Sequence, residues 1–140
     1  MNKQKREILF EKARKAALNA DFHGQHVGCV ITYKGIPIAT GSCSEKTHPN
    51  QKVYNEYRKP QLNQELLPKV HAEIAALNKI RSMDLNPKKL AIYTYRTRKD
   101  QQYGMARPCK SCLIAIKDMG IRDIYYTTNN GYAHEVLDLE

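Results

Sequence analysis

The chain has 140 residues, a length that suits a single domain, residues 1–140, built around one hydrophobic core. Hydrophobic residues make up 41% and charged residues 26%, no apolar run approaches a membrane span, and no signal core follows the basic N-terminus, so we expect a cytoplasmic protein with no membrane partner. The net charge of +9 favours anionic partners such as nucleotides or nucleic acids, although solubility alone would also explain it.

The first half of the chain predicts a helix followed by a hairpin. Apolar residues at helical spacing indicate an amphipathic helix over residues 3–20. Two strands are expected at residues 26–33 and 36–40, joined by a tight turn, with Gly41 ending the second strand. Residues 42–68 are long, polar and irregular. We expect them to form a wall of the substrate pocket, with a surface loop as the alternative.

The second half alternates helices with strands. Pro108 fits the first turn of the later helix, and Gly120 is suited to end it. The tail over residues 132–140 reads either as a short helix or as an edge strand. The expected elements are a helix at 70–83, a strand at 90–95, a polar loop at 96–107, a helix at 109–119, a strand at 121–127 and a turn at 129–131.

This order of elements predicts a three-layer α/β domain with crossover connections. The first two strands should pair as an antiparallel hairpin, whereas the two strands beside the later helices should be parallel neighbours. We therefore expect a mixed sheet of four to five strands that begins with a hairpin.

Two short motifs carry the chemistry. His71-Ala72-Glu73 and Pro108-Cys109-Lys110-Ser111-Cys112 supply one His and two Cys as ligands for a zinc ion, and they leave a fourth position for water. Both motifs fall at expected helix starts, where partial positive charge stabilises a thiolate. Glu73 would move protons beside the metal rather than bind it, because side chains two apart on a helix do not share a face.

Other uses of these residues remain open. Cys109 and Cys112 would also suit thioredoxin-like redox chemistry, but that leaves His71 and Glu73 without a role. A closed structural zinc site would need a fourth protein ligand, for which the sequence offers His48, Cys43 and His134. Cys29 lies in an apolar run and is expected to be a buried hydrophobic residue.

With these motifs the chain resembles the cytidine deaminase superfamily, specifically its deoxycytidylate and tRNA-adenosine deaminase branch. The resemblance covers roughly residues 5–128 and is strongest over residues 70–74, 107–112 and 120–126. It implies a cytidine deaminase-like α-β-α fold and one zinc ion held by His71, Cys109 and Cys112. It further implies that Glu73 shuttles protons and that the backbone of Ala72 contacts the base. Relatives are often dimers or larger homo-oligomers.

The resemblance and the charge leave several substrates open. We expect cytosine in a deoxycytidylate-like nucleotide or in a single-stranded nucleic acid, which hydrolysis by zinc-bound hydroxide would convert to uracil and ammonia. The alternatives are adenosine in tRNA or another RNA, and a silent zinc domain that only binds nucleic acid. Basic and aromatic side chains in the two polar loops suit phosphates and bases. The candidate substrate contacts, besides Ala72, are Ser42, Cys43, His48, Tyr54, Tyr57, Arg58 and Arg107.

Overall fold

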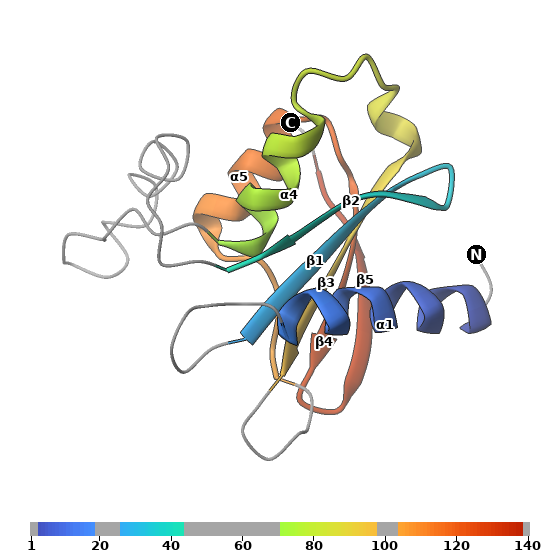
Figure 1. Ribbon diagram of the computed structural model, residues 1–140. Coiled ribbons are helices and arrows are strands. Elements are labelled where there is room, and N and C mark those ends of the chain that lie inside the picture. The colour runs from blue at the N-terminus through green and yellow to red at the C-terminus, as the bar shows by residue number, and fades with distance from the viewer. Residues whose placement is uncertain (1–2, 19–25, 44–70, 98–103, 139–140) are drawn as a thin grey trace, which may run out of the picture.

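A central β-sheet separates one helix from two others (Figure 1). The computed structural model describes residues 3–18, 26–43, 71–97 and 104–138. Helix α1 (Lys3–Leu18) covers one face of the sheet, and α4 (Ala72–Ile80) and α5 (Lys110–Asp118) lie side by side on the other. This arrangement confirms the predicted three layers. The strands are β1 (His26–Tyr33), β2 (Ile36–Ser42), β3 (Leu90–Thr97), β4 (Asp123–Thr128) and β5 (Gly131–Val136), and the 3₁₀ helix η1 (Pro87–Lys89) precedes β3.

The five strands lie in the order β2-β1-β3-β4-β5. β1 pairs antiparallel with both β2 and β3, β3 runs parallel to β4, and β5 returns antiparallel to β4. The predicted hairpin and the predicted parallel pair are therefore both confirmed. The hairpin turn uses positive φ angles at Lys34 (53°) and Gly35 (82°), which match the twist of the flanking strands.

Two hydrophobic cores lie on the two faces of the sheet because successive strand residues point to opposite sides. Cys29 and Ile31 on β1 face α4 and α5, within the larger core. Val30 faces α1, where it packs with Phe10 and Tyr93. The buried Cys29 confirms the interpretation of that cysteine as a core residue.

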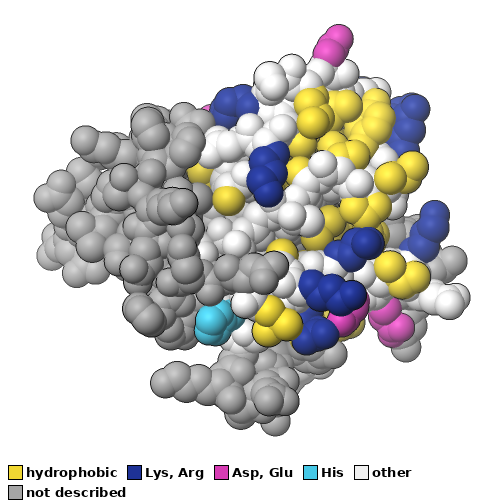
Figure 2. Space-filling model, in the orientation of Figure 1, with side chains coloured by type: hydrophobic (Ala, Val, Ile, Leu, Met, Phe, Trp, Pro, Cys, Tyr) yellow, Lys and Arg dark blue, Asp and Glu magenta, His cyan; other side chains and the backbone are white. Residues whose placement is uncertain are grey.

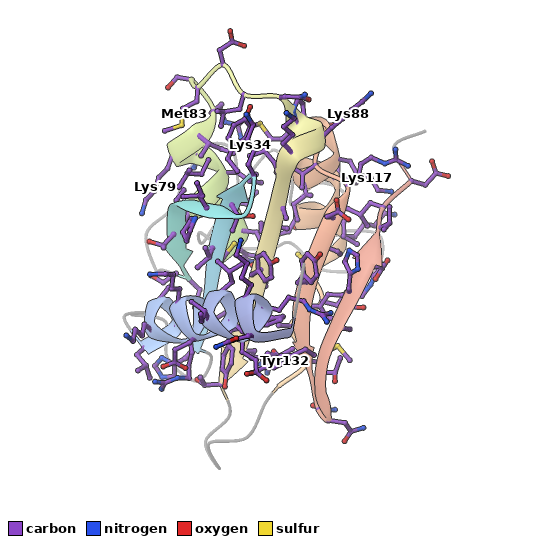
Figure 3. All side chains as sticks on the ribbon, turned by 90° about the vertical axis from the view of Figure 1, so that its right-hand side faces the viewer. Lys34, Lys79, Met83, Lys88, Lys117 and Tyr132 are labelled. Carbon is purple, nitrogen blue, oxygen red and sulfur yellow. The ribbon has the colours of Figure 1, made fainter. Side chains whose placement is uncertain are left out.

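Helix α4 packs on the sheet and is also hydrogen-bonded to the edge strand β2. Its buried face includes Ile74, Leu77 and Ile80, which recur at helical spacing. At the exposed side, the Lys79 ammonium reaches β2 and donates a hydrogen bond of 2.6 Å to the carbonyl of Thr40 (Figure 3).

Gly41 does not end the second strand as predicted, because β2 continues to Ser42. A Cβ at this position would meet the backbone carbonyl of Ala72 and lie 2.6 Å from the backbone nitrogen of Ala76. Glycine is therefore needed for the close approach of β2 to α4, and it does not break the strand.

Several other predicted boundaries shift by a few residues. Helix α4 starts after His71 and stops at Ile80, where the N–H of Met83 bonds the Ile80 carbonyl and closes a turn. Pro108 precedes helix α5 rather than occupying its first turn, because Cys109 is the N-cap residue. β3 runs on to Thr97 because its end pairs with the start of β1. β4 begins at Asp123, and the ambiguous tail forms the edge strand β5.

Figure 2 shows Lys and Arg side chains spread over the visible face, and those in the region of α1 lie among Asp and Glu side chains. Lys5, Lys12 and Lys15 on α1 are exposed to solvent. Across the described ranges, no helix combines the length and the apolar character needed to cross a membrane.

Candidate metal centre

The imidazole of His71 and the thiols of Cys109 and Cys112 converge on one point. Their ligand atoms all lie within 4.8 Å of one another. The Nδ1 atom of His71 is 3.3 Å from the Cys112 Sγ and 3.6 Å from the Cys109 Sγ. A tetrahedral zinc ion would separate nitrogen and sulfur ligands by about 3.6 Å, given Zn–N and Zn–S bonds of about 2.1 and 2.3 Å. The three residues are therefore positioned to bind one metal ion.

Two helix starts present these ligands. His71 and Cys109 are the N-cap residues of α4 and α5, each in an extended conformation. Their carbonyls accept the first hydrogen bonds of the two helices, from Ala75 at 3.0 Å and from Leu113 at 2.8 Å. Cys112 follows one turn into α5 and is fully buried, whereas His71 and Cys109 are half-buried. A metal ion held here can consequently be reached from the side of the two N-caps.

The segment that leads into α5 is anchored to the ends of β3 and β4. The N–H of Gly104 donates to the carbonyl of Arg96 (2.9 Å), and the N–H of Ala106 donates to the carbonyl of Thr127 (2.8 Å). The buried Thr127 hydroxyl donates to the carbonyl of Gly104 (2.7 Å) and accepts from the N–H of Arg96 (3.1 Å). These bonds fix where Cys109 enters the site.

Glu73 is buried next to the three ligands but is not one of them. Its side chain is only 5% exposed, and its carboxylate lies outside the cluster whose ligand atoms are within 4.8 Å. Burial raises the pKa of Glu73 above its ordinary value, against the charge of His71, which lowers it. The Glu73 side chain also hydrogen-bonds with Cys112, so it borders the ligand cluster without being part of it.

The two thiols differ in acidity. In the metal-free protein the pKa of Cys109 falls to about 3, mainly because Cys112 donates a hydrogen bond to it, with His71 and Ser111 adding to the effect. The pKa of Cys112 is raised by that same bond and by burial. The first thiolate of the pair therefore forms at Cys109, and thiolate is the state that binds zinc.

Of the three alternatives for a fourth protein ligand, the two that the structure describes, His134 and Cys43, do not belong to the ligand cluster. His134 lies on β5, where its ring stacks on Tyr125 at 4.1 Å and its Nε2 is 3.0 Å from the Asp123 carboxylate. Tyr125 packs on the α1 side of the sheet, away from α4 and α5. Cys43 is buried at the end of β2 and is not part of the ligand cluster. His48 lies outside the described residues.

The remaining predicted substrate contacts divide into three groups. Ser42 is the last residue of β2 and Cys43 follows it, directly after Gly41, whose backbone approaches Ala72 of α4. The guanidinium of Arg107 pairs with Glu135 of β5 through bonds of 2.9 and 2.8 Å. The others, Tyr54, Tyr57, Arg58 and again His48, belong to residues 44–70 and lie outside the described part.

Sequence reasoning missed three residues that support the site. Ser111 contacts a metal ligand, Thr127 anchors the segment before α5, and Glu135 holds Arg107. Ser111 sits within the second motif, so its position gave a signal. Thr127 and Glu135 come from strands that no local pattern connects to residues 104–109.

The chain matches a known protein family over a range that includes all three ligand residues. The family model described as "Cytidine and deoxycytidylate deaminase zinc-binding region" matches residues 3–128. A search of curated proteins finds no match.

Solved structures with a similar fold include a dCMP deaminase from the cyanophage S-TIM5 and a cytidine deaminase from Burkholderia pseudomallei. The cyanophage protein in apo form has a TM-score of 0.64 at 16% identity, covering 91% of this chain and 86% of its own. The same protein in complex with dCMP and dUMP has a TM-score of 0.60, also at 16% identity, covering 91% and 84%. The Burkholderia protein has a TM-score of 0.64 at 15% identity, covering 97% and 93%. At these identities the likeness shows the fold.

Proposed function

Because the chain belongs to the cytidine and deoxycytidylate deaminase family, we propose that it converts cytosine to uracil in a deoxycytidylate-like nucleotide. Family membership makes it a zinc-dependent hydrolytic deaminase; the base and the molecule that carries it are our proposal. The observation on which the proposal rests is the buried Glu73 beside, and not within, the His71, Cys109 and Cys112 cluster. A carboxylate that is not a ligand is free to carry protons.

The donor set suits zinc because two thiolates and one neutral imidazole are preferred zinc ligands. Held by these three residues, zinc would supply a Lewis acid that makes water acidic enough to give hydroxide near neutral pH. Glu73 would take one proton from the attacking water and deliver it to the ring nitrogen, and it would then carry the second proton of that water, from the new hydroxyl group, to the amine that leaves as ammonia. The overall reaction consumes one water and releases ammonia. Ala72, between His71 and Glu73, offers its backbone to the base.

Cytosine is favoured over adenine by the family and by the solved structures of similar fold. The family model is named for cytidine and deoxycytidylate, and the cyanophage protein was solved with dCMP and dUMP. A nucleotide carrier is supported by the net charge of +9. The experiment compares the free nucleotide with two other substrates, which are cytosine in a single-stranded nucleic acid and adenosine in RNA.

The test is ammonia release by the zinc-loaded protein with four substrates: cytidine, deoxycytidylate, a cytosine-containing single-stranded oligonucleotide and an adenosine-containing RNA hairpin. We expect turnover with deoxycytidylate and its loss, by at least about 100-fold, in Glu73→Gln with zinc content unchanged. Turnover of the oligonucleotide alone would contradict the nucleotide proposal, and a steep fall of its binding with added salt would mark a polyanionic substrate. Turnover of the RNA alone would replace cytosine by adenine as the base.

A further inference from the structure

The hydroxyl of Ser111 contacts one of the metal ligands. Ser111 is the second residue of α5, and its side chain is 0% exposed. Its Oγ lies 3.0 Å from the Sγ of Cys109. For the ranges that the structure describes, no other hydrogen bond of this hydroxyl is recorded. A serine in the first turn of a helix ordinarily bonds to the backbone or to water, so the direction of this side chain is distinctive.

The chemistry of a metal-bound cysteine sets the direction of the bond. A cysteine that holds zinc is a thiolate, which has no proton to give and can only accept. The Ser111 hydroxyl must therefore donate. Because the bond is buried, no bulk water competes for the donor, and hydrogen bonds to a charged acceptor are stronger than neutral ones.

The bond makes the two cysteine ligands unequal. Cys109 is a half-buried N-cap residue, so the start of the helix alone leaves its side chain room to turn. Cys112 is fully buried and its Sγ lies 3.3 Å from the Nδ1 of His71. Packing therefore holds Cys112, whereas Cys109 gains a hydroxyl donor that restrains it.

We propose that Ser111 is a positioning residue of the metal centre, whose buried hydroxyl donates to the Cys109 Sγ and thereby tightens the binding of zinc. The inference rests on the zinc deaminase assignment, and it concerns the metal and not the substrate. Partners that orient metal ligands typically contribute 10- to 100-fold to metal affinity. Removing the hydroxyl should cost at least about 10-fold at this site.

The experiment compares Ser111→Ala with wild type in zinc binding, measured by competition with a chromophoric chelator. Thr94→Val is the matched control, since it also removes a buried hydroxyl facing the same core, but one that lies beside the thiol of Cys29, which is not a metal ligand. We expect about 10-fold weaker zinc binding in Ser111→Ala and an unchanged affinity in Thr94→Val. Cobalt(II) substitution should show a shifted thiolate-to-metal absorption band only in Ser111→Ala, because the charge on the Cys109 sulfur changes.

A second pair of variants separates the hydroxyl from packing. Ser111→Thr and Ser111→Val add similar bulk at the buried position, but only Thr keeps a donor. The inference requires Thr to bind zinc more tightly than Val by about 10-fold. Equal affinities within this pair, or a Ser111→Ala protein with wild-type zinc affinity and an unshifted cobalt band, would overturn it. These readouts use no substrate, so a wrong choice of base would leave them unaffected, whereas a wild-type protein that binds no zinc would remove both the assignment and the inference.

Discussion

Arg107 and Glu135 join the segment before α5 to the edge strand β5 through two parallel hydrogen bonds. The Nε of Arg107 donates to Oε1 at 2.9 Å and its Nη2 donates to Oε2 at 2.8 Å. The hydroxyl of Tyr126 on β4 donates to the same Oε1 at 3.0 Å. A guanidinium two residues before Cys109 is thereby aimed at β5, and the pair supports the segment that carries a metal ligand.

The Arg107–Glu135 pair should make a small, pH-dependent contribution to stability. The bond from Arg107 lowers the pKa of Glu135 below its ordinary value of 4.5. A carboxyl whose pKa is lowered in the folded state adds stability at higher pH, and that stability is lost as pH falls from about 4.5 through the folded pKa. Because the pair is exposed, Glu135→Gln should cost no more than about 1 kcal/mol at pH 7.

Urea unfolding at pH 7, 5 and 3 would measure this cost. The difference between wild type and Glu135→Gln should hold between pH 7 and 5 and shrink towards pH 3. A difference as large at pH 3 as at pH 7 would mean that the glutamate acts through packing rather than through its charge.

Two buried threonine hydroxyls should respond in opposite ways to replacement by valine. The Thr127 hydroxyl donates to the carbonyl of Gly104 and accepts from the N–H of Arg96. Thr127→Val leaves both backbone groups without this partner, so it should lower the free energy of unfolding by about 1–3 kcal/mol. The Thr94 hydroxyl has no nitrogen or oxygen partner among the described residues and lies beside the Cys29 thiol, which is only a weak hydrogen-bonding group. Thr94→Val should therefore be neutral or slightly stabilising. Thermal unfolding of both variants tests the contrast, and a larger loss in Thr94→Val than in Thr127→Val would refute it.

Gly41→Ala should damage the metal centre as well as the fold. The added methyl group would strike the backbone of α4 at Ala72 and Ala76, and α4 begins at His71 and carries Glu73. We expect a loss of about 1–3 kcal/mol in unfolding free energy and weaker zinc binding.

Gly28→Ala is the matched control for this prediction. Its added methyl group would strike the backbone of α1 at Ala13 and Ala17, on the opposite face of the sheet. This variant should lose comparable stability while the folded fraction keeps its zinc affinity. If both variants lost zinc equally, the effect would come from general destabilisation rather than from the position of α4.

Cys112→Ser should abolish stoichiometric zinc binding, because it removes one of three converging ligands. Cys43→Ala should retain a full equivalent of zinc, since the Cys43 thiol is buried outside the ligand cluster. Metal analysis of the purified variants after dialysis decides between these outcomes. Loss of zinc in Cys43→Ala would indicate that Cys43 is a fourth protein ligand of a closed site. A full equivalent of zinc in Cys112→Ser would refute the ligand assignment.

Much of the fold follows from local patterns in the sequence. The hairpin turn between β1 and β2 and the end of α5 before Gly120 depend on neighbours within a few residues, and the sequence predicts both. The errors arose where a distant segment decides. The local pattern at Gly41 predicts the end of a strand, because the sequence does not show that α4 packs against this residue.

The sequence by itself predicted the metal-binding chemistry, because His71, Cys109 and Cys112 are zinc-ligand types at a spacing typical of such sites, with Glu73 two residues after the first of them. The tertiary structure alone decided which groups serve that chemistry. It placed Ser111 on the Cys109 sulfur, turned Arg107 to Glu135 and put His134 on the other face of the sheet. The physical reason is that the ability to bind a metal is a property of each side chain. Which residues hold the ligands in place, and which lie away from the site, depends on contacts between segments far apart in the chain.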